Sequence, residues 1–278
     1  MKSIYISVIL SALHICVCSQ TLENQTFKKI NGRVVDNEGR PLEYVNIGIK
    51  NENFGTMSFR NGLFELSIPY KYQNDTLSFL HLGFETEKRP IANLYNNETI
   101  MLFPETYSLS EVTITPTQSR RQKIGITMHN RFLTLATKNQ EFALFMKPRR
   151  LPAKVELLNF YVNWSELEDT IHLRINFYAV TDSMPGNNLL MQDIVVKHLI
   201  ERGWNELDLR PYNVVMAEEF FVSVQWLDDL DQKTEKRFRY AGVLIRPRNM
   251  YVRSTLFSTA IWQKIPGIVK SMYLQVLN

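Results

Sequence analysis

The histidines are the first side chains to test for metal or catalytic chemistry. A hydrolytic zinc site needs two or three His or carboxylate ligands at a fixed spacing, such as His-Glu-x-x-His on one helix. The chain contains no such motif, and it also lacks the Gly-x-Ser-x-Gly elbow that marks many serine hydrolases. We therefore expect no metal site, no cofactor and no enzymatic activity. The histidines outside the first nineteen residues are His81, His129, His172 and His198.

Two acidic turns could in principle support catalysis by carboxylates or the binding of calcium. Residues 166–169 include three carboxylates, and a glycosidase needs only two carboxylates that face each other across a cleft. A carbohydrate-active enzyme that uses carboxylates is therefore an alternative. Asp228, Asp229 and Asp231 form the second turn, which lacks the central glycine and the full ligand set of a calcium loop. We expect this second turn to be solvated.

A row of polar and aromatic side chains carries the binding hypothesis. Segments 158–164 and 171–179 alternate apolar with polar residues, which is typical of strands with one buried face. Residues 165–170 have a length that suits a hairpin. Pairing would put Phe160 and Phe177 on the core side and six candidate ligand-binding residues on the other. These are Tyr161, Asn163, His172, Arg174, Asn176 and Tyr178. Two tyrosine rings beside hydrogen-bonding groups suit a polysaccharide, and an ordinary solvated sheet face is the alternative.

The elements that must position these residues are strands. In residues 26–115, short alternating segments are separated by turn residues at a spacing of about ten, a pattern typical of an all-β sandwich. Asn61-Gly62 predicts a tight turn, with Gly62 at positive φ, because both residues tolerate that conformation. In the segment that follows, Phe64, Leu66 and Ile68 share one face.

Several motifs in this first half resemble those of the carboxypeptidase-like regulatory domain, over about residues 27–115. They are Gly32-x-Val34-x-Asp36, Gly39-x-Pro41-Leu42, Asn61-Gly62-x-Phe64-x-Leu66 and Leu82-Gly83-Phe84. The resemblance implies a seven-stranded, prealbumin-like sandwich and does not imply peptidase activity. In bacteria with an outer membrane, such a domain also precedes TonB-dependent importers. About 160 residues remain here, too few for the barrel of about 22 strands that an importer needs.

The second half is also rich in predicted strands. Residues 203–209 and 212–214 resemble a jelly-roll-like domain of exported bacterial proteins that has no assigned activity. We therefore expect an all-β chain whose second domain is a β-sandwich or jelly roll. Trp164 and Trp226 fall in register with apolar faces and are assigned to the core. Trp204 and Trp262 stand beside turns and are expected to be partly exposed.

The N-terminus predicts export. Lys2 precedes an apolar stretch at residues 4–17, and the small residues near its end suit cleavage between Ser19 and Gln20. Both cysteines, Cys16 and Cys18, lie in the segment that would be removed, so we expect no disulfide afterwards. No transmembrane helix is expected after cleavage.

The sequence therefore predicts an exported binding or structural module, periplasmic or associated with the outer membrane, and not an enzyme. A polysaccharide or an outer-membrane protein is the expected partner. The net charge of +4 is too small and too dispersed to indicate nucleic acid. A small outer-membrane barrel with a periplasmic domain is a further alternative. The predicted parts are a signal peptide at 1–19, the regulatory domain at 20–115, a linker at 116–123 and a β-sandwich domain at 124–278.

Overall fold

The structure is a computed structural model of the 278-residue chain. The described residues are 27–49, 55–105, 120–135, 140–168, 170–190, 192–227, 237–244, 250–254, 261–265 and 267–278. The predicted cleavage site at Ser19 and Gln20 and the acidic turn of Asp228, Asp229 and Asp231 lie outside these ranges. Within the ranges, no helix has the length and hydropathy needed to cross a bilayer. All of the larger elements are strands, so the all-β prediction is confirmed.

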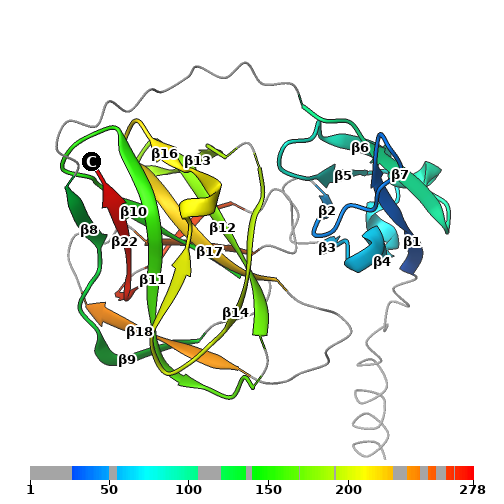
Figure 1. The fold of residues 1–278 in the computed structure, drawn as a ribbon. Helices are drawn as coiled ribbons and strands as arrows, with labels where there is room; N and C mark the ends of the chain where they lie inside the picture. The colour runs from blue at the N-terminus through cyan, green and yellow to red at the C-terminus, as the bar shows by residue number, and fades with distance from the viewer. Residues whose placement is uncertain are drawn as a thin grey trace, which may run out of the picture.

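The first seven strands form two sheets, which agrees with the predicted sandwich (Figure 1). The three-stranded sheet has the order β4-β1-β7, and β1 is antiparallel to β4 and parallel to β7. The four-stranded sheet has the order β3-β2-β5-β6. The bounds are β1 Phe27–Asp36, β2 Asn46–Ile49, β3 Gly55–Met57, β4 Leu63–Pro69, β5 Thr76–Leu80, β6 Glu87–Pro90 and β7 Glu98–Leu102. Short 3-10 turns at Arg60–Gly62, Tyr70–Tyr72 and Ile91–Asn93 connect some of them.

One apolar core joins these two sheets. Phe64, Leu66 and Ile68 of β4 are buried together, as their alternation predicts. The turn before β4 also has the predicted conformation, with φ of 67° at Asn61 and 69° at Gly62. A side chain at position 62 would start 2.2 Å from the carbonyl oxygen of Val34, so this turn requires glycine.

The remaining strands form two larger sheets. The β12 sheet has seven strands in the order β13-β12-β17-β10-β19-β20, and β14 also pairs with β12. Its bounds are β10 Gln140–Met146, β12 Thr170–Thr181, β13 Met184–Asn188, β14 Ile194–Leu199, β17 Phe220–Leu227, β19 Met250–Ser254 and β20 Gln263–Lys264.

The β11 sheet has eight strands in the order β21-β18-β11-β22-β8, and β15, β16 and β9 pair off this path. Its bounds are β8 Arg121–Gly125, β9 Asn130–Leu135, β11 Ala153–Ser165, β15 Gly203–Asp208, β16 Val215–Met216, β18 Phe238–Leu244, β21 Ile268–Lys270 and β22 Met272–Leu277. A 3-10 turn at Arg210–Tyr212 follows β15. Because β8 begins at Arg121 and pairs with β22, the last three residues of the predicted linker belong to a strand.

The β11 and β12 sheets pack face to face around a second core. Phe160 of β11 and Phe177 of β12 are completely buried in one apolar cluster, as is typical of a sandwich. Trp226 is buried there as predicted, but Trp164 is 39% exposed, so its assignment to the core is wrong. The pairing of β11 with β18 shifts register between Val162 and Trp164. Such a bulge changes the alternation of faces along a strand.

Candidate functional site

The six residues of the predicted ligand face do not lie together. β11 and β12 are in different sheets, and the two strands do not pair with each other. Phe160 and Phe177 do face the core as predicted, but from opposite layers. The hairpin prediction is therefore wrong. Tyr161 and Asn163 lie on the outer side of the β11 sheet, whereas the other four lie on the outer side of the β12 sheet: His172, Arg174, Asn176 and Tyr178.

Part of the outer side of the β12 sheet is covered by the N-terminal sheets. The Nη2 atom of Arg174 donates hydrogen bonds to the carbonyl oxygen of Tyr44 at 2.8 Å and to Asp193 Oδ2 at 3.0 Å. Arg174 is only 4% exposed. The ring of Tyr44 also lies 6.0 Å from that of His172. A second domain thus occupies the place where a ligand of Arg174 would have to lie.

Farther along the same side, the polar side chains around Glu141 form hydrogen bonds with one another. Glu141 of β10 is fully buried and accepts hydrogen bonds from Asn176 Nδ2 at 2.8 Å, from Tyr178 at 2.7 Å and from the hydroxyl of Ser223. Arg253 Nε donates to its other oxygen at 2.7 Å. Burial alone would raise the pKa of Glu141, but the guanidinium and these donors outweigh it and hold the pKa below its ordinary value. This cluster is a satisfied ionic network, and it offers no open acceptor.

The outer side of the β11 sheet carries a different arrangement, a cluster of aromatic rings. Trp204 of β15, Tyr161 of β11 and Tyr273 of β22 come from three neighbouring strands. The ring centroids of Tyr161 and Trp204 are 5.3 Å apart, and those of Trp204 and Tyr273 are 4.9 Å apart. The imidazole of His129 lies 4.0 Å from the ring of Tyr161. We call these four residues the aromatic face.

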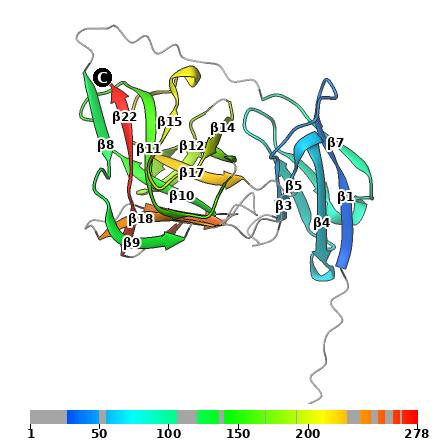
Figure 2. The same ribbon diagram turned by 60° about the horizontal axis from the view of Figure 1, so that its bottom comes forward.

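The strand register explains why these rings share one side. Leu158 and Phe160 of β11 point into the core, so the alternate residues Asn159 and Tyr161 point outward. Tyr161 stands directly opposite Trp204, and Asn159 stands opposite Tyr273. Figure 2 shows β15, β11, β22 and β8 next to one another, on the side of the molecule away from the N-terminal sheets.

Exposed rings and polar groups are combined on this surface. The Trp204 side chain is 37% exposed, and His129 is exposed as well. The Lys123 ammonium lies 4.9 Å from the ring centroid of Tyr273, a cation–π contact. The buried Nδ2 atom of Asn159 has no hydrogen-bond partner in the described part of the chain. An unpaired buried amide is uncommon in folded proteins, and Asn159 stands opposite Tyr273 in the strand register.

Sequence reasoning found only part of this surface. It named Tyr161 and Asn163 as ligand residues and correctly predicted that Trp204 is partly exposed. It did not single out Tyr273, and it tested His129 only as a metal ligand. Within the described ranges, no three His, Cys, Asp or Glu side chains gather as they would around a metal ion.

Among solved structures, two chains of the cysteine protease Cwp84 are similar to this one. The clostridial Cwp84 after propeptide cleavage is 10% identical, with a TM-score of 0.42, and the match covers 84% of this chain and 65% of that one. The cysteine protease and lectin-like domains of Cwp84, a surface layer associated protein of Clostridium difficile, are 11% identical with a TM-score of 0.38, covering 84% and 58%. This chain therefore spans less than two thirds of either.

No curated protein matches the chain. The family model described as the CarboxypepD_reg-like domain matches residues 30–114, less than half of the chain. This match covers all but the start of the seven strands of the first two sheets. The N-terminal part of the chain, over residues 30–114, is therefore a carboxypeptidase-like regulatory domain, as its motifs indicate.

Proposed function

We propose that this chain is an exported, non-catalytic binding module whose aromatic face holds a glycan. The observation that carries the proposal is the environment of Trp204, which is 37% exposed although it lies between two tyrosine rings. A large aromatic side chain gains most by burial, so a partly exposed indole that neighbouring rings hold in place indicates a binding surface.

The chemistry of this face suits sugars. A pyranose ring has one side rich in C–H bonds, which packs on an aromatic ring, and an edge of hydroxyl groups that need hydrogen-bond partners. The indole of Trp204 supplies the apolar contact, while the exposed ammonium of Lys123, beside the ring of Tyr273, supplies a polar group nearby. Because strands of one sheet fix the rings in place, binding would lose little conformational entropy.

The rest of the chain supports a role outside the cytoplasm. The charged start, the apolar stretch at residues 4–17 and the small residue Ser19 are typical of a signal peptide. We propose a periplasmic or surface location, with a polysaccharide as the principal partner. The regulatory domain is placed beside the β12 sheet through Tyr44 and Arg174, which leaves the aromatic face on the other side.

A direct test uses the chain from Gln20 to Asn278. It is screened against host and microbial polysaccharides on an array, and the hits are titrated by calorimetry. We expect saturable binding to at least one glycan and no change in that glycan after long incubation. Release of shorter sugars would favour the alternative of a carboxylate enzyme, and the absence of any saturable binding would contradict the proposal.

A further inference from the structure

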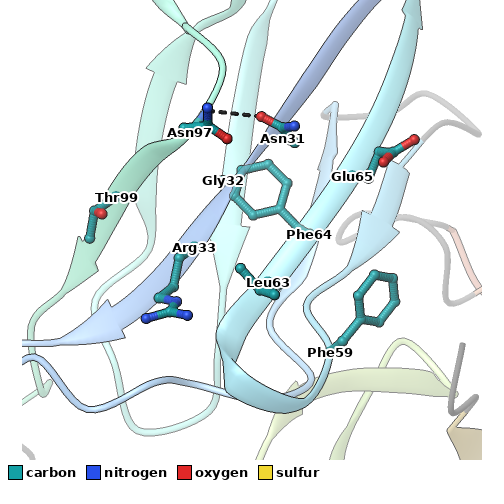
Figure 3. A pocket seen from close by; sticks show the side chains of 9 residues that line it. All are labelled: Asn31, Gly32, Arg33, Phe59, Leu63, Phe64, Glu65, Asn97 and Thr99. Atoms are coloured by element: carbon teal, nitrogen blue, oxygen red, sulfur yellow. Dashed lines mark hydrogen bonds between the residues drawn. The ribbon is translucent and has the colours of Figure 1, made fainter. Parts of the chain in front are cut away.

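A separate pocket lies on the regulatory domain, far along the chain from the aromatic face. It has a volume of about 510 Å³, within the range of small-ligand sites. Its lining residues come from β1, β4, β7 and the segments just before β4 and β7, and Figure 3 shows their side chains. Among them are Asn31, Arg33, Phe59, Leu63, Asn97 and Thr99.

The strand register places the polar residues of this pocket in rows. Arg33 of β1 stands between Leu63 of β4 and Thr99 of β7. Asn31, two residues earlier, stands opposite Glu65. Because residues two apart on a strand share a face, Arg33 and Asn31 point to the same side of the sheet.

The pocket has one positive charge, that of Arg33, in excess. Glu65 forms an ion pair with Lys29 at 2.7 Å, so its carboxylate is already neutralised. Arg33 has no ion pair or hydrogen-bond partner for its side chain in the described part of the chain. Asn31 Oδ1 accepts a hydrogen bond from the backbone N–H of Asn97 at 2.8 Å, which leaves the Asn31 amide hydrogens for another acceptor.

One wall of the pocket is apolar. Leu63 is 45% exposed, and Phe59 is half-buried. A ligand that satisfies this pocket therefore needs an anionic group for the guanidinium and an apolar group for Leu63 and Phe59. A planar carboxylate matches the two parallel N–H donors of a guanidinium best.

We propose that this pocket binds a carboxylate that carries an apolar group, and that Arg33 is its anchor. Two sources share this chemistry: the free C-terminus of a peptide that ends in an apolar residue, and a small aliphatic acid. A peptide has an additional amide next to its carboxylate, and the side chains of Asn31 and Asn97 can hydrogen-bond to it.

The test is an NMR titration of the chain from Gln20 to Asn278 with three probes: N-acetyl-leucine, N-acetyl-leucinamide and hexanoate. We expect N-acetyl-leucine to shift the amide signals of Leu63, Asn97 and Thr99 saturably, and the uncharged amide to bind at least about tenfold more weakly. Stronger binding of N-acetyl-leucine than of hexanoate would identify the peptide source, and the reverse order would identify the aliphatic acid.

Two matched variants decide whether Arg33 is the anchor. Arg33→Gln keeps hydrogen-bond donors but removes the charge, and we expect it to weaken N-acetyl-leucine binding at least about tenfold. Lys88→Gln removes one exposed charge from β6, outside the pocket, and should leave binding unchanged. Equal binding of the acid and its amide, equal loss in both variants, or no saturable shift with either acid would overturn the proposal.

Discussion

The ring of Tyr161 stands nearly perpendicular to the indole of Trp204, with an interplanar angle of 88° and a centroid separation of 5.3 Å. The two residues face each other directly across β11 and β15, so this edge-to-face contact is fixed by strand pairing. Such pairs contribute about 0.5–1.5 kcal/mol beyond the area that they bury. The contact therefore holds the partly exposed indole in one orientation, which a binding surface requires.

The turn before β4 gives the first prediction. Gly62 has a φ of 69°, and an added Cβ would lie 2.2 Å from Val34 O. We expect Gly62→Ala to lower the free energy of unfolding by about 2–3 kcal/mol, because it adds a backbone clash to the positive-φ strain. Gly39 also has positive φ but nothing within 4 Å, so Gly39→Ala should cost only about 1 kcal/mol. Equal losses in urea denaturation would show that the clash is relieved without cost.

The buried carboxylate gives the second prediction. Removing one partner of a buried ion pair costs about 3–5 kcal/mol. Because a quarter of the Arg253 side chain is exposed, water offsets part of this, and we expect Glu141→Gln to destabilise the fold by about 3 kcal/mol at pH 7. Glu219, paired with Lys147 at the surface, provides the control, since Glu219→Gln should change stability by less than about 1 kcal/mol.

The pH dependence of the Glu141 effect follows from the direction of its pKa shift. The pKa of Glu141 is lowered in the folded state, so its stabilising contribution is complete above the unfolded value of about 4.3 and is lost as the pH falls through the folded pKa. The difference between wild type and Glu141→Gln should therefore shrink below about pH 4 in denaturation curves. A difference that stays constant down to pH 2 would contradict an ionised Glu141.

A buried lysine gives the third prediction. The Nζ atom of Lys270 lies 3.0 Å from the ring centroid of Phe142 and 3.8 Å from that of Tyr240, with no hydrogen-bond partner among the described residues. Burial lowers the pKa of Lys270 well below its ordinary value. We expect Lys270→Met to stabilise the protein at pH 7 by about 1–3 kcal/mol, the cost of burying an unpaired polar group.

The sign of the pH effect checks the Lys270 assignment. With a lowered folded pKa, the folded state binds fewer protons than the unfolded state, so wild-type stability rises with pH up to about 10.4. The advantage of Lys270→Met should therefore be smaller at pH 10 than at pH 7. Lys264→Met, at an exposed position on β20, should stay within about 0.5 kcal/mol of wild type. An advantage for Lys270→Met that does not depend on pH would contradict a titrating amine at this position.

The alternation in segments 158–164 and 171–179 was sufficient to predict two strands and their core residues except Trp164, because period two reports which side chains face an apolar layer. It carries no information on which strand lies alongside. The two strands belong to different sheets, so the segments expected to pair lie in opposite layers. The aromatic face combines three strands that are distant in sequence, which is why only Tyr161 and the exposure of Trp204 were predicted.

Burial of a polar face is the other feature that alternation misses. Arg174, Asn176 and Tyr178 have the spacing of a solvated strand face, yet all three are buried. Tyr44 of the regulatory domain covers the first, and the Glu141 network binds the other two. These covering groups come from more than 30 residues away in the chain. The local sequence pattern of the strand therefore cannot predict that its polar side chains are buried.

The most direct test of the account is the effect of Trp204→Ala on glycan binding, measured by calorimetry with the best polysaccharide from the array. Trp164→Ala is the matched control, because Trp164 lies on the same sheet with a similar exposure of 39% and stacks on Arg239 outside the aromatic face. Both variants should keep the wild-type circular dichroism spectrum. We predict that Trp204→Ala weakens binding by at least about tenfold, or 1.4 kcal/mol, and that Trp164→Ala leaves it unchanged. Wild-type affinity in the Trp204→Ala variant, or an equal loss in both, would contradict a glycan site on the aromatic face.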